Sequence, residues 1–100
     1  MRDELYINGF KLVLTCYACP EQYDVYSPSD KQVAYFRLRH GNFSVTCPDV
    51  RGEEVYRAQP KGDGIFESTE RMKYLREAVQ AVEDFQVSEL FKQESDGFYS

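Results

Sequence analysis

The strongest constraint on the fold lies between Tyr23 and Cys47, where three short runs alternate apolar and polar residues across two turn signals. In the run from 32 to 40 the apolar residues share one parity: Ala34, Phe36 and Leu38. The residues between them are Tyr35, Arg37 and Arg39. Side chains of a strand point alternately to its two faces. The pattern therefore predicts a half-buried sheet with a tyrosine and two arginines on its open face.

Turn residues divide the first sixty positions into strands. Asn8-Gly9 stands between two apolar runs, which is the strongest short hairpin signal because both residues tolerate positive φ. Further turns are indicated at 28–31 and 40–42, and Pro48 should end the preceding strand because it cannot donate to a ladder. Glu53 to Ala58 is the last predicted strand, with Val55 and Arg57 on one face.

A helical period begins near residue 68. Four apolar residues recur at intervals of three and four: Met72, Leu75, Val79 and Val82. This spacing predicts an amphipathic helix over about 68–86, with Ser68 or Thr69 as the N-cap. Val87 and Phe91 leave the apolar register, so we expect a break near Gln86 and a less regular tail over 87–100.

Together these elements predict one α+β domain over residues 1–100. Its strands lie within 4–59 and form an antiparallel meander of about four or five strands. A loop follows over 59–67, and the single C-terminal amphipathic helix packs on one face of the sheet. The open face should carry polar and aromatic side chains, which are Tyr26, Tyr35, Arg37, Arg39, Ser44, Thr46 and Asp24, with Arg57 beside them.

Charge is unevenly distributed along the chain. The formal net charge is −5, yet residues 31–61 carry six basic and three acidic side chains, a local excess of +3. The acidic total argues against binding driven by nucleic-acid phosphates, which needs clustered Lys and Arg. One interpretation is a basic patch for an acidic partner. The other is that the arginines offset the acidic helix and pair with Asp24, Glu53 or Glu54 across strands.

The cysteines raise the question of a metal site. Cys16 and Cys19 have C-x-x-C spacing, and the Cys/His set that could hold zinc adds His40 and Cys47. With His40 at a hairpin tip, Cys47 would lie roughly 16 Å away along the strand, which disfavours a shared metal. A redox pair would need a helix after the motif, whereas a strand is predicted there. We therefore expect structural thiols and no cofactor, with zinc binding as an alternative.

No catalytic arrangement is apparent. There is one histidine, the paired carboxylates are sequence neighbours that point apart, and the glycines of 61–64 lack phosphate-loop spacing. We expect a protein that is not an enzyme.

The sequence contains no apolar run of membrane-spanning length and no signal-like start, so the expected location is the cytoplasm.

The favoured function is a small interaction module that binds a protein partner through the open face or an edge strand. Its tentative binding residues are Tyr35, Arg37, Arg39, Arg57 and Tyr26. Size and composition are typical of small bacterial or phage accessory and inhibitor proteins. The alternative is a single-stranded nucleic-acid binder that uses the same tyrosines and arginines. The oligomeric state stays open, a weak homodimer included.

Overall fold

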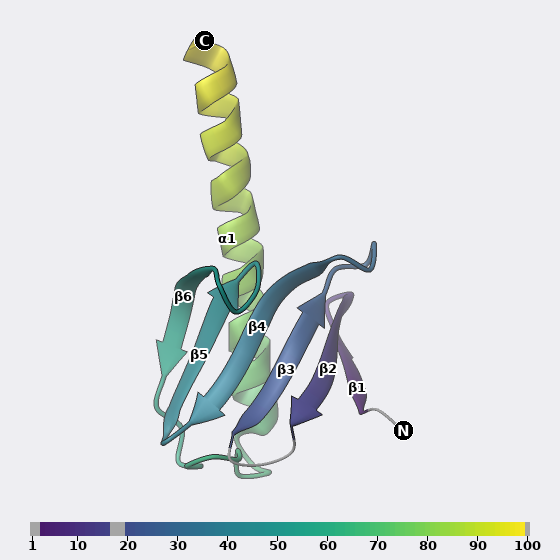
Figure 1. Ribbon diagram of the computed structural model, residues 1–100, viewed down its shortest axis with the longest axis vertical. Helices are drawn as coiled ribbons and strands as arrows, with labels where there is room; N and C mark the ends of the chain where they lie inside the picture. Colours follow the sequence, from purple (N-terminus) through teal and green to yellow (C-terminus); the bar gives the residue numbers. More distant parts are fainter. Residues whose placement is uncertain (1–2, 17–19, 100) are drawn as a thin grey trace.

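The structure is a computed structural model that describes residues 3–16 and 20–99, and it is an antiparallel meander with one long helix. Within those residues six strands form one sheet in chain order, which confirms the α+β prediction with slightly more strands than expected (Figure 1). The elements are β1 (Glu4–Ile7), β2 (Phe10–Cys16), β3 (Glu21–Tyr26), β4 (Gln32–Arg39), β5 (Asn42–Cys47), β6 (Glu53–Ala58) and α1 (Arg71–Tyr99).

Two tight turns set the register of the meander. Asn8 and Gly9 have φ of 52° and 86°, and His40 and Gly41 have φ of 53° and 74°. Paired positive φ values fit the twist of two-residue hairpins. Because His40-Gly41 completes the second turn, Asn42 begins β5 and does not belong to the turn as the sequence suggested.

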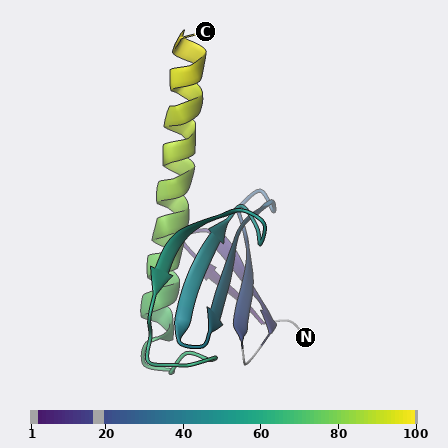
Figure 2. The same cartoon turned by 60° about the vertical axis from the view of Figure 1, so that its left-hand side comes forward.

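The core lies between the helix and one face of the sheet. The predicted inward residues of β4 are all fully buried, and so are the central apolar residues of α1: Leu75, Ala78, Val79 and Val82. Edge-to-face aromatic contacts fill the centre, with Phe43 5.9 Å from Phe36 and 4.9 Å from Phe66 between ring centroids. The helix crosses β4, β5 and β6 on this side only (Figure 2). The opposite side of the sheet, here called the open face, is left uncovered by the helix.

The helix is longer than predicted. Instead of breaking near Gln86, α1 continues through the expected irregular tail to Tyr99, and its upper part extends beyond the sheet (Figure 1). The sequence of α1 has no proline, and its single glycine, Gly97, lies near its end. Backbone hydrogen bonds can therefore continue after the apolar face has turned away from the sheet. No helix in the described part of the chain combines the length and apolarity needed to cross a membrane.

The helix also begins differently. Its first residue is Arg71, and a turn closed at Glu67 precedes it, in place of a Ser68 or Thr69 cap. The Glu67 carbonyl accepts the N–H of Glu70 at 3.0 Å, and the Glu70 carboxylate accepts the N–H of Glu67 at 3.1 Å. The same carboxylate accepts the N–H groups of Lys61 and Gly62 at 2.9 Å each. These contacts attach the loop before the helix to its first turn.

A buried carboxylate joins the sheet to the base of the helix. Glu21, at the start of β3, is 2% exposed. Its two oxygens accept hydrogen bonds from the Tyr23 hydroxyl (2.5 Å), the Phe66 N–H (2.9 Å) and the Arg71 guanidinium (2.9 and 3.2 Å). The Glu21 N–H donates to the Gly64 carbonyl at 2.8 Å. Burial, followed by the hydrogen bond to Glu21, raises the pKa of Tyr23. The network connects β3, the 59–70 loop and α1.

Replacing Phe36 tests which face of the sheet is buried. Phe36→Ala should lower the free energy of unfolding by about 3–5 kcal/mol, because it leaves a cavity in the packed core. Arg37→Ala, one residue away on the open face, should change it by under about 1 kcal/mol. Urea denaturation of the two variants measures both values. A larger loss for Arg37→Ala would mean that the faces are reversed.

Replacing Glu21 tests the buried network. Glu21→Gln keeps the size of the side chain but removes the charge that pairs with Arg71, and should cost about 3 kcal/mol of unfolding free energy. The matched control is Glu54→Gln, the same change in an exposed ion pair, which should cost under about 1 kcal/mol. Equal losses in thermal and urea unfolding would contradict a structural role for the Glu21 network.

Candidate functional site

The register of the central strands gathers the basic residues of the open face. Arg37 on β4 lies opposite Ser44 on β5, and Ser44 lies opposite Arg57 on β6. Two residues further along β4, Arg39 lies opposite Asn42. Since neighbouring strands are about 4.8 Å apart, the backbones of Arg37 and Arg57 are separated by roughly 10 Å. Three arginines therefore surround one short stretch of β5.

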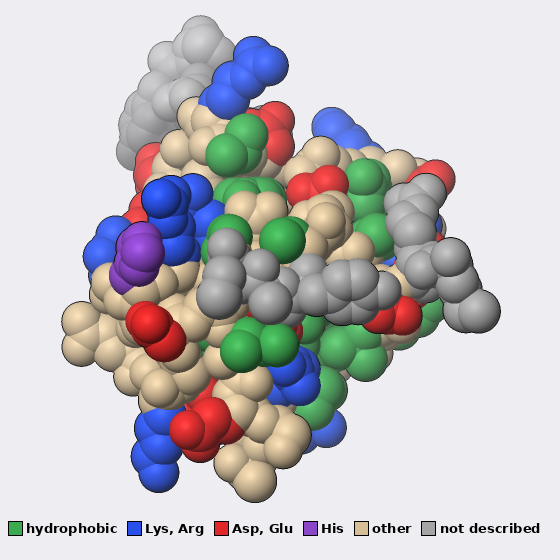
Figure 3. All heavy atoms as spheres, turned by 60° about the horizontal axis from the view of Figure 1, so that its bottom comes forward, with side chains coloured by type: hydrophobic (Ala, Val, Ile, Leu, Met, Phe, Trp, Pro, Cys, Tyr) green, Lys and Arg blue, Asp and Glu red, His purple; other side chains and the backbone are tan. Residues whose placement is uncertain are grey.

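These residues line a shallow hollow of about 270 Å³, here called the basic hollow. Its lining residues are Arg37, Arg39, His40, Asn42, Ser44 and Arg57. Figure 3 shows this end of the molecule, where basic side chains gather beside the histidine. The guanidinium groups supply fixed positive charge, and the serine and asparagine add neutral hydrogen-bonding groups. The arrangement suits a ligand with carboxylate or other anionic oxygens.

The arginines differ in their partners. Arg57 forms a two-pronged ion pair with Glu54 on the same strand, at 3.0 Å from Nε and 2.9 Å from Nη2. The hydrogen bond from Arg57 lowers the pKa of Glu54. This pair lies within β6, three residues apart, whereas the expected pairing of open-face arginines with Glu54 was across strands. Among residues whose side chains the structure describes, Arg37 and Arg39 form no ion pair with a carboxylate.

A second hollow adjoins Tyr35 at the other end of β4. It measures about 420 Å³ and is here called the loop hollow, because the loop between β5 and β6 forms one wall. Its lining residues are Asp24, Gln32, Tyr35, Asp49, Val50 and Arg51. Burial raises the pKa of Asp24, and it also raises that of Tyr35, against the opposing charge of Arg37. Tyr35 therefore lies between an acidic neighbour and a basic one.

Tyr26 lies apart from the other predicted site residues. It is at the end of β3, opposite Lys11 and Gln32, and it lines neither hollow. The Lys11 ammonium lies 5.3 Å from the centre of the Tyr26 ring and forms an ion pair with Asp30 at 3.2 Å. The structure thus brings Arg37, Arg39 and Arg57 together and places Tyr35 beside them. It does not bring Tyr26 into the group.

Two features of the site were not anticipated. His40 and Asn42 line the basic hollow, although the sequence placed both in a turn. Extending the alternation of β5 back from Ser44 would have identified Asn42.

The second feature is a bulge in the pairing of β5 with β6, which makes Val55 an extra residue. Val55 packs against the core while Arg57 faces the opposite side, so the prediction that they share a face is wrong.

The cysteines that the structure describes lie on opposite faces of the sheet. Cys47 is 1% exposed within the core, whereas a bulge in β2 pairs Cys16 with Gln22 on the open face. His40 is at the other end of β5 from Cys47. Cys16 and Cys47 therefore cannot ligate one metal ion. Cys19 lies outside the described residues, and among the residues that are described no group of three or more Cys, His, Asp or Glu side chains could hold a metal ion.

Two titratable groups on the covered side of the sheet, Glu21 and Tyr56, have structural partners. The Tyr56 hydroxyl donates to Glu77 at 2.6 Å, which links β6 to the helix, and burial raises the pKa of Tyr56. Glu21 is enclosed by its own donors. Within the described part of the chain, no buried side-chain nitrogen or oxygen lacks a hydrogen-bond partner. These groups hold elements together and do not face either hollow.

Comparisons with known proteins identify no relative. No protein-family model matches the chain, and searches of curated proteins and of solved structures give no significant match.

The environment of Cys47 predicts its reactivity. Burial, with a smaller contribution from the charge of Glu53, raises the pKa of the Cys47 thiol to about 11, so little thiolate exists near neutral pH. In the folded protein Cys47 should resist iodoacetamide, and it should react after denaturation in urea. Mass spectrometry of peptides from protein alkylated under both conditions measures this. Rapid alkylation of Cys47 in the native protein would contradict its place in the core.

Proposed function

We propose that this protein is a non-enzymatic interaction module whose open face binds an acidic surface of a protein partner. The observation that carries the proposal is the basic hollow, in which three arginines from two strands surround β5. Neighbouring strands fix the spacing of the backbone positions that carry these side chains. The proposal therefore rests on the geometry of β4, β5 and β6.

Recognition would follow from the chemistry of guanidinium. Arginine offers a planar fork of donors that matches a carboxylate, and it is favoured at the energetic centre of protein interfaces. Arg37 and Arg39 are the primary candidates, since no described carboxylate pairs with them. Arg57 could exchange Glu54 for a partner carboxylate at low cost, because exposed ion pairs contribute only about 0–1 kcal/mol. Tyr35 adds aromatic area beside them.

Pairing through a sheet edge is the weaker mode. The edges of the described sheet are β1 and β6. β1 has only 4 residues, and the bulge in β6 interrupts a regular ladder. Short and bulged edges oppose the addition of another strand. The open face is therefore the preferred surface.

A protein partner also fits the charge better than nucleic acid does. The whole chain is acidic, at −5, so a nucleic-acid backbone would be attracted only over the basic hollow. A base-stacking platform needs several exposed aromatic rings near the basic residues. Tyr35 is near the arginines of the basic hollow. Tyr26 lies at the other end of the sheet, where the Lys11 ammonium lies over its ring.

The test is affinity capture from a lysate of the source cells, of which one portion is treated with nuclease and one is left untreated. Wild-type protein is compared with Arg37→Glu/Arg39→Glu, and captured proteins are identified by mass spectrometry. The matched control is Lys73→Glu/Arg76→Glu, which changes the net charge equally but on the exposed side of the helix. We expect a protein captured by the wild type and the control and lost with the open-face variant.

Two results would overturn the proposal. One is capture of the same proteins by all three baits, which would place binding elsewhere. The other is a nuclease-sensitive complex lost with the open-face variant, which would identify the ligand as nucleic acid.

A further inference from the structure

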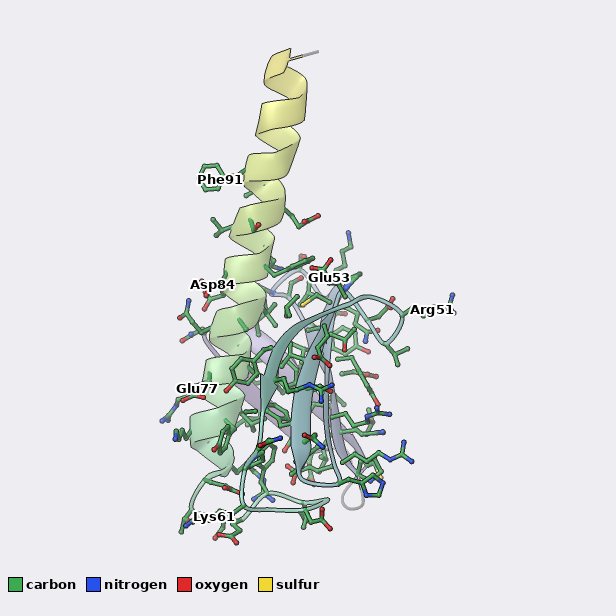
Figure 4. The ribbon with its side chains drawn as sticks, turned by 90° about the vertical axis from the view of Figure 1, so that its left-hand side faces the viewer. Arg51, Glu53, Lys61, Glu77, Asp84 and Phe91 are labelled. Atoms are coloured by element: carbon green, nitrogen blue, oxygen red, sulfur yellow. The ribbon has the colours of Figure 1, made fainter. Side chains whose placement is uncertain are left out.

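A third hollow, of about 540 Å³, lies between the helix and the edge strand β6, and it is here called the edge groove. Figure 4 views the molecule from this side, with Glu77 and Asp84 on the helix and Glu53 on β6 at the level of Asp84. Half of the side chains that line the groove are apolar or aromatic: Val55, Tyr56, Ala81 and Phe85. The other half are polar: Glu53, Glu54, Asp84 and Ser88. The edge groove is therefore an amphipathic surface, and it shares no lining residue with the basic hollow or the loop hollow.

The apolar part of the groove exists because β6 is the last strand of the described sheet. Ala81 and Phe85 line the groove from the helix, and no further described strand covers them. The bulge in β6 adds Val55 beside them, an extra residue that no residue of β5 opposes. All three are only partly buried, although Val55 and Phe85 pack against the core. They therefore retain apolar surface that a ligand can cover.

Two carboxylates of the groove have no basic partner among the described side chains. One is Glu53, which lies opposite the buried Cys47 and is therefore directed to the helix side of the sheet. The other is Asp84, whose carboxylate accepts a hydrogen bond from the neutral amide of Gln80 at 3.1 Å. Glu54 differs, because it pairs with an arginine of its own strand. No lysine or arginine is among the described residues that line the groove, so its charge favours a cationic ligand.

The spacing along the helix indicates an extended ligand. Glu77 lies seven residues before Asp84, which places both on one side of the helix and about 10 Å apart along its axis. Above the groove, the helix carries a second, exposed apolar stripe of Val87, Leu90 and Phe91. Phe91 is a further seven residues after Asp84 and continues the same side of the helix (Figure 4). A partner helix packed along α1 repeats its contacts at this seven-residue interval.

Other occupants fit the groove less well. The described residues include no group of three or more Cys, His, Asp or Glu side chains that could hold a metal ion. The bulge in β6 opposes the addition of a strand. The helix of a second copy carries four basic and six acidic residues over 71–99, a net charge of −2, so the carboxylates of the groove would repel it. These observations favour a basic helix from a different protein.

We infer that the edge groove binds a basic amphipathic helix of a partner protein, which lies along α1. The apolar side chains of that helix cover Val55 and Phe85, as in other complexes in which a helix occupies a groove. Lysines or arginines beside its apolar side chains pair with Glu53 and Asp84. The inference goes beyond the proposed function, because the open face binds an acidic partner. A protein with both surfaces joins two partners of opposite charge.

Fluorescence anisotropy with a labelled designed peptide tests the inference. The peptide is an amphipathic helix of leucine and lysine, and the comparison is an oligolysine of equal length, which carries charge without an apolar side. We expect the wild type to bind the leucine–lysine peptide, more weakly as salt is raised. It should bind the oligolysine at least about tenfold more weakly, because the apolar part of the groove then stays uncovered.

Two groove variants and a matched control locate the binding. Glu53→Gln/Asp84→Asn should weaken affinity for the leucine–lysine peptide about tenfold, because two exposed ion pairs are lost. Ser88→Arg places a long basic side chain in the groove and should also weaken it at least about tenfold. The control Asp63→Asn/Glu67→Gln removes the same charge from exposed positions in the loop before the helix and should change affinity under about threefold. Circular dichroism verifies that each variant is folded.

Four results would overturn the inference. They are failure of the wild type to bind the leucine–lysine peptide at low salt, equal affinity for the oligolysine, undiminished binding by Ser88→Arg, and equal losses in the charge variant and its control. Self-association of the wild type that Ser88→Arg abolishes would identify a second copy as the occupant and would also contradict it. The open-face variant Arg37→Glu/Arg39→Glu should keep its affinity for the peptide, so these results are independent of the capture experiment.

Discussion

The buried contact between Glu21 and Arg71 determines how the two layers of this protein are arranged. Glu21 begins β3, Arg71 begins the helix, and Phe66 lies in the loop between β6 and the helix. A carboxylate that is 2% exposed is tolerated only because every donor around it is directed at its oxygens. This requirement fixes the base of the helix against the bottom of the sheet. The anchor fixes where α1 begins, and the apolar side chains that α1 shares with the sheet determine the face it covers.

With the helix anchored, the two faces of the sheet have different roles. The covered face is filled by side chains such as Phe36 and Phe43, which pack against α1. The open face needs no hydrophobic complement for folding, so its residues are not dictated by the core. Three arginines lie around one stretch of β5, and among the described side chains Arg57 alone of the three has a carboxylate partner, so the positive charges of Arg37 and Arg39 are left to repel each other. An anionic ligand would relieve that repulsion, and this is the physical basis of the proposed function.

Much of the fold follows from local rules that the sequence displays. Alternation over 32–47 identified the buried face, and Asn8-Gly9 identified a hairpin, because both depend only on nearby residues. The continuous helix was missed because a shift in apolar register resembles a break. Here the shift marks the change from packing on the sheet to a second stripe around Phe91. The Glu21 network was also missed. Glu21 has the parity of Tyr23 and Val25, but its partner Arg71 is fifty residues away, and no local pattern connects them.

The arginines of the site were predictable individually, since Arg37 and Arg39 stand at outward positions of one strand. Their convergence with Arg57 was less so, because a bulge in the pairing of β5 and β6 determines the face on which Arg57 lies. Bulges leave little trace in a single sequence. The same reasoning explains Cys16, which a bulge in β2 moves to the open face, away from Cys47.

The most direct test of the account is nuclear magnetic resonance of ¹⁵N-labelled protein titrated with poly-L-glutamate, a simple acidic chain. Binding at the open face predicts salt-sensitive amide shifts clustered on β4, β5 and β6, centred on Arg37, Arg39, Ser44 and Arg57. The Arg37→Glu/Arg39→Glu variant should lose them. Absence of residue-specific shifts at low salt, or shifts confined to the helix base around Arg71, would contradict the claim that the open face recognises an acidic partner.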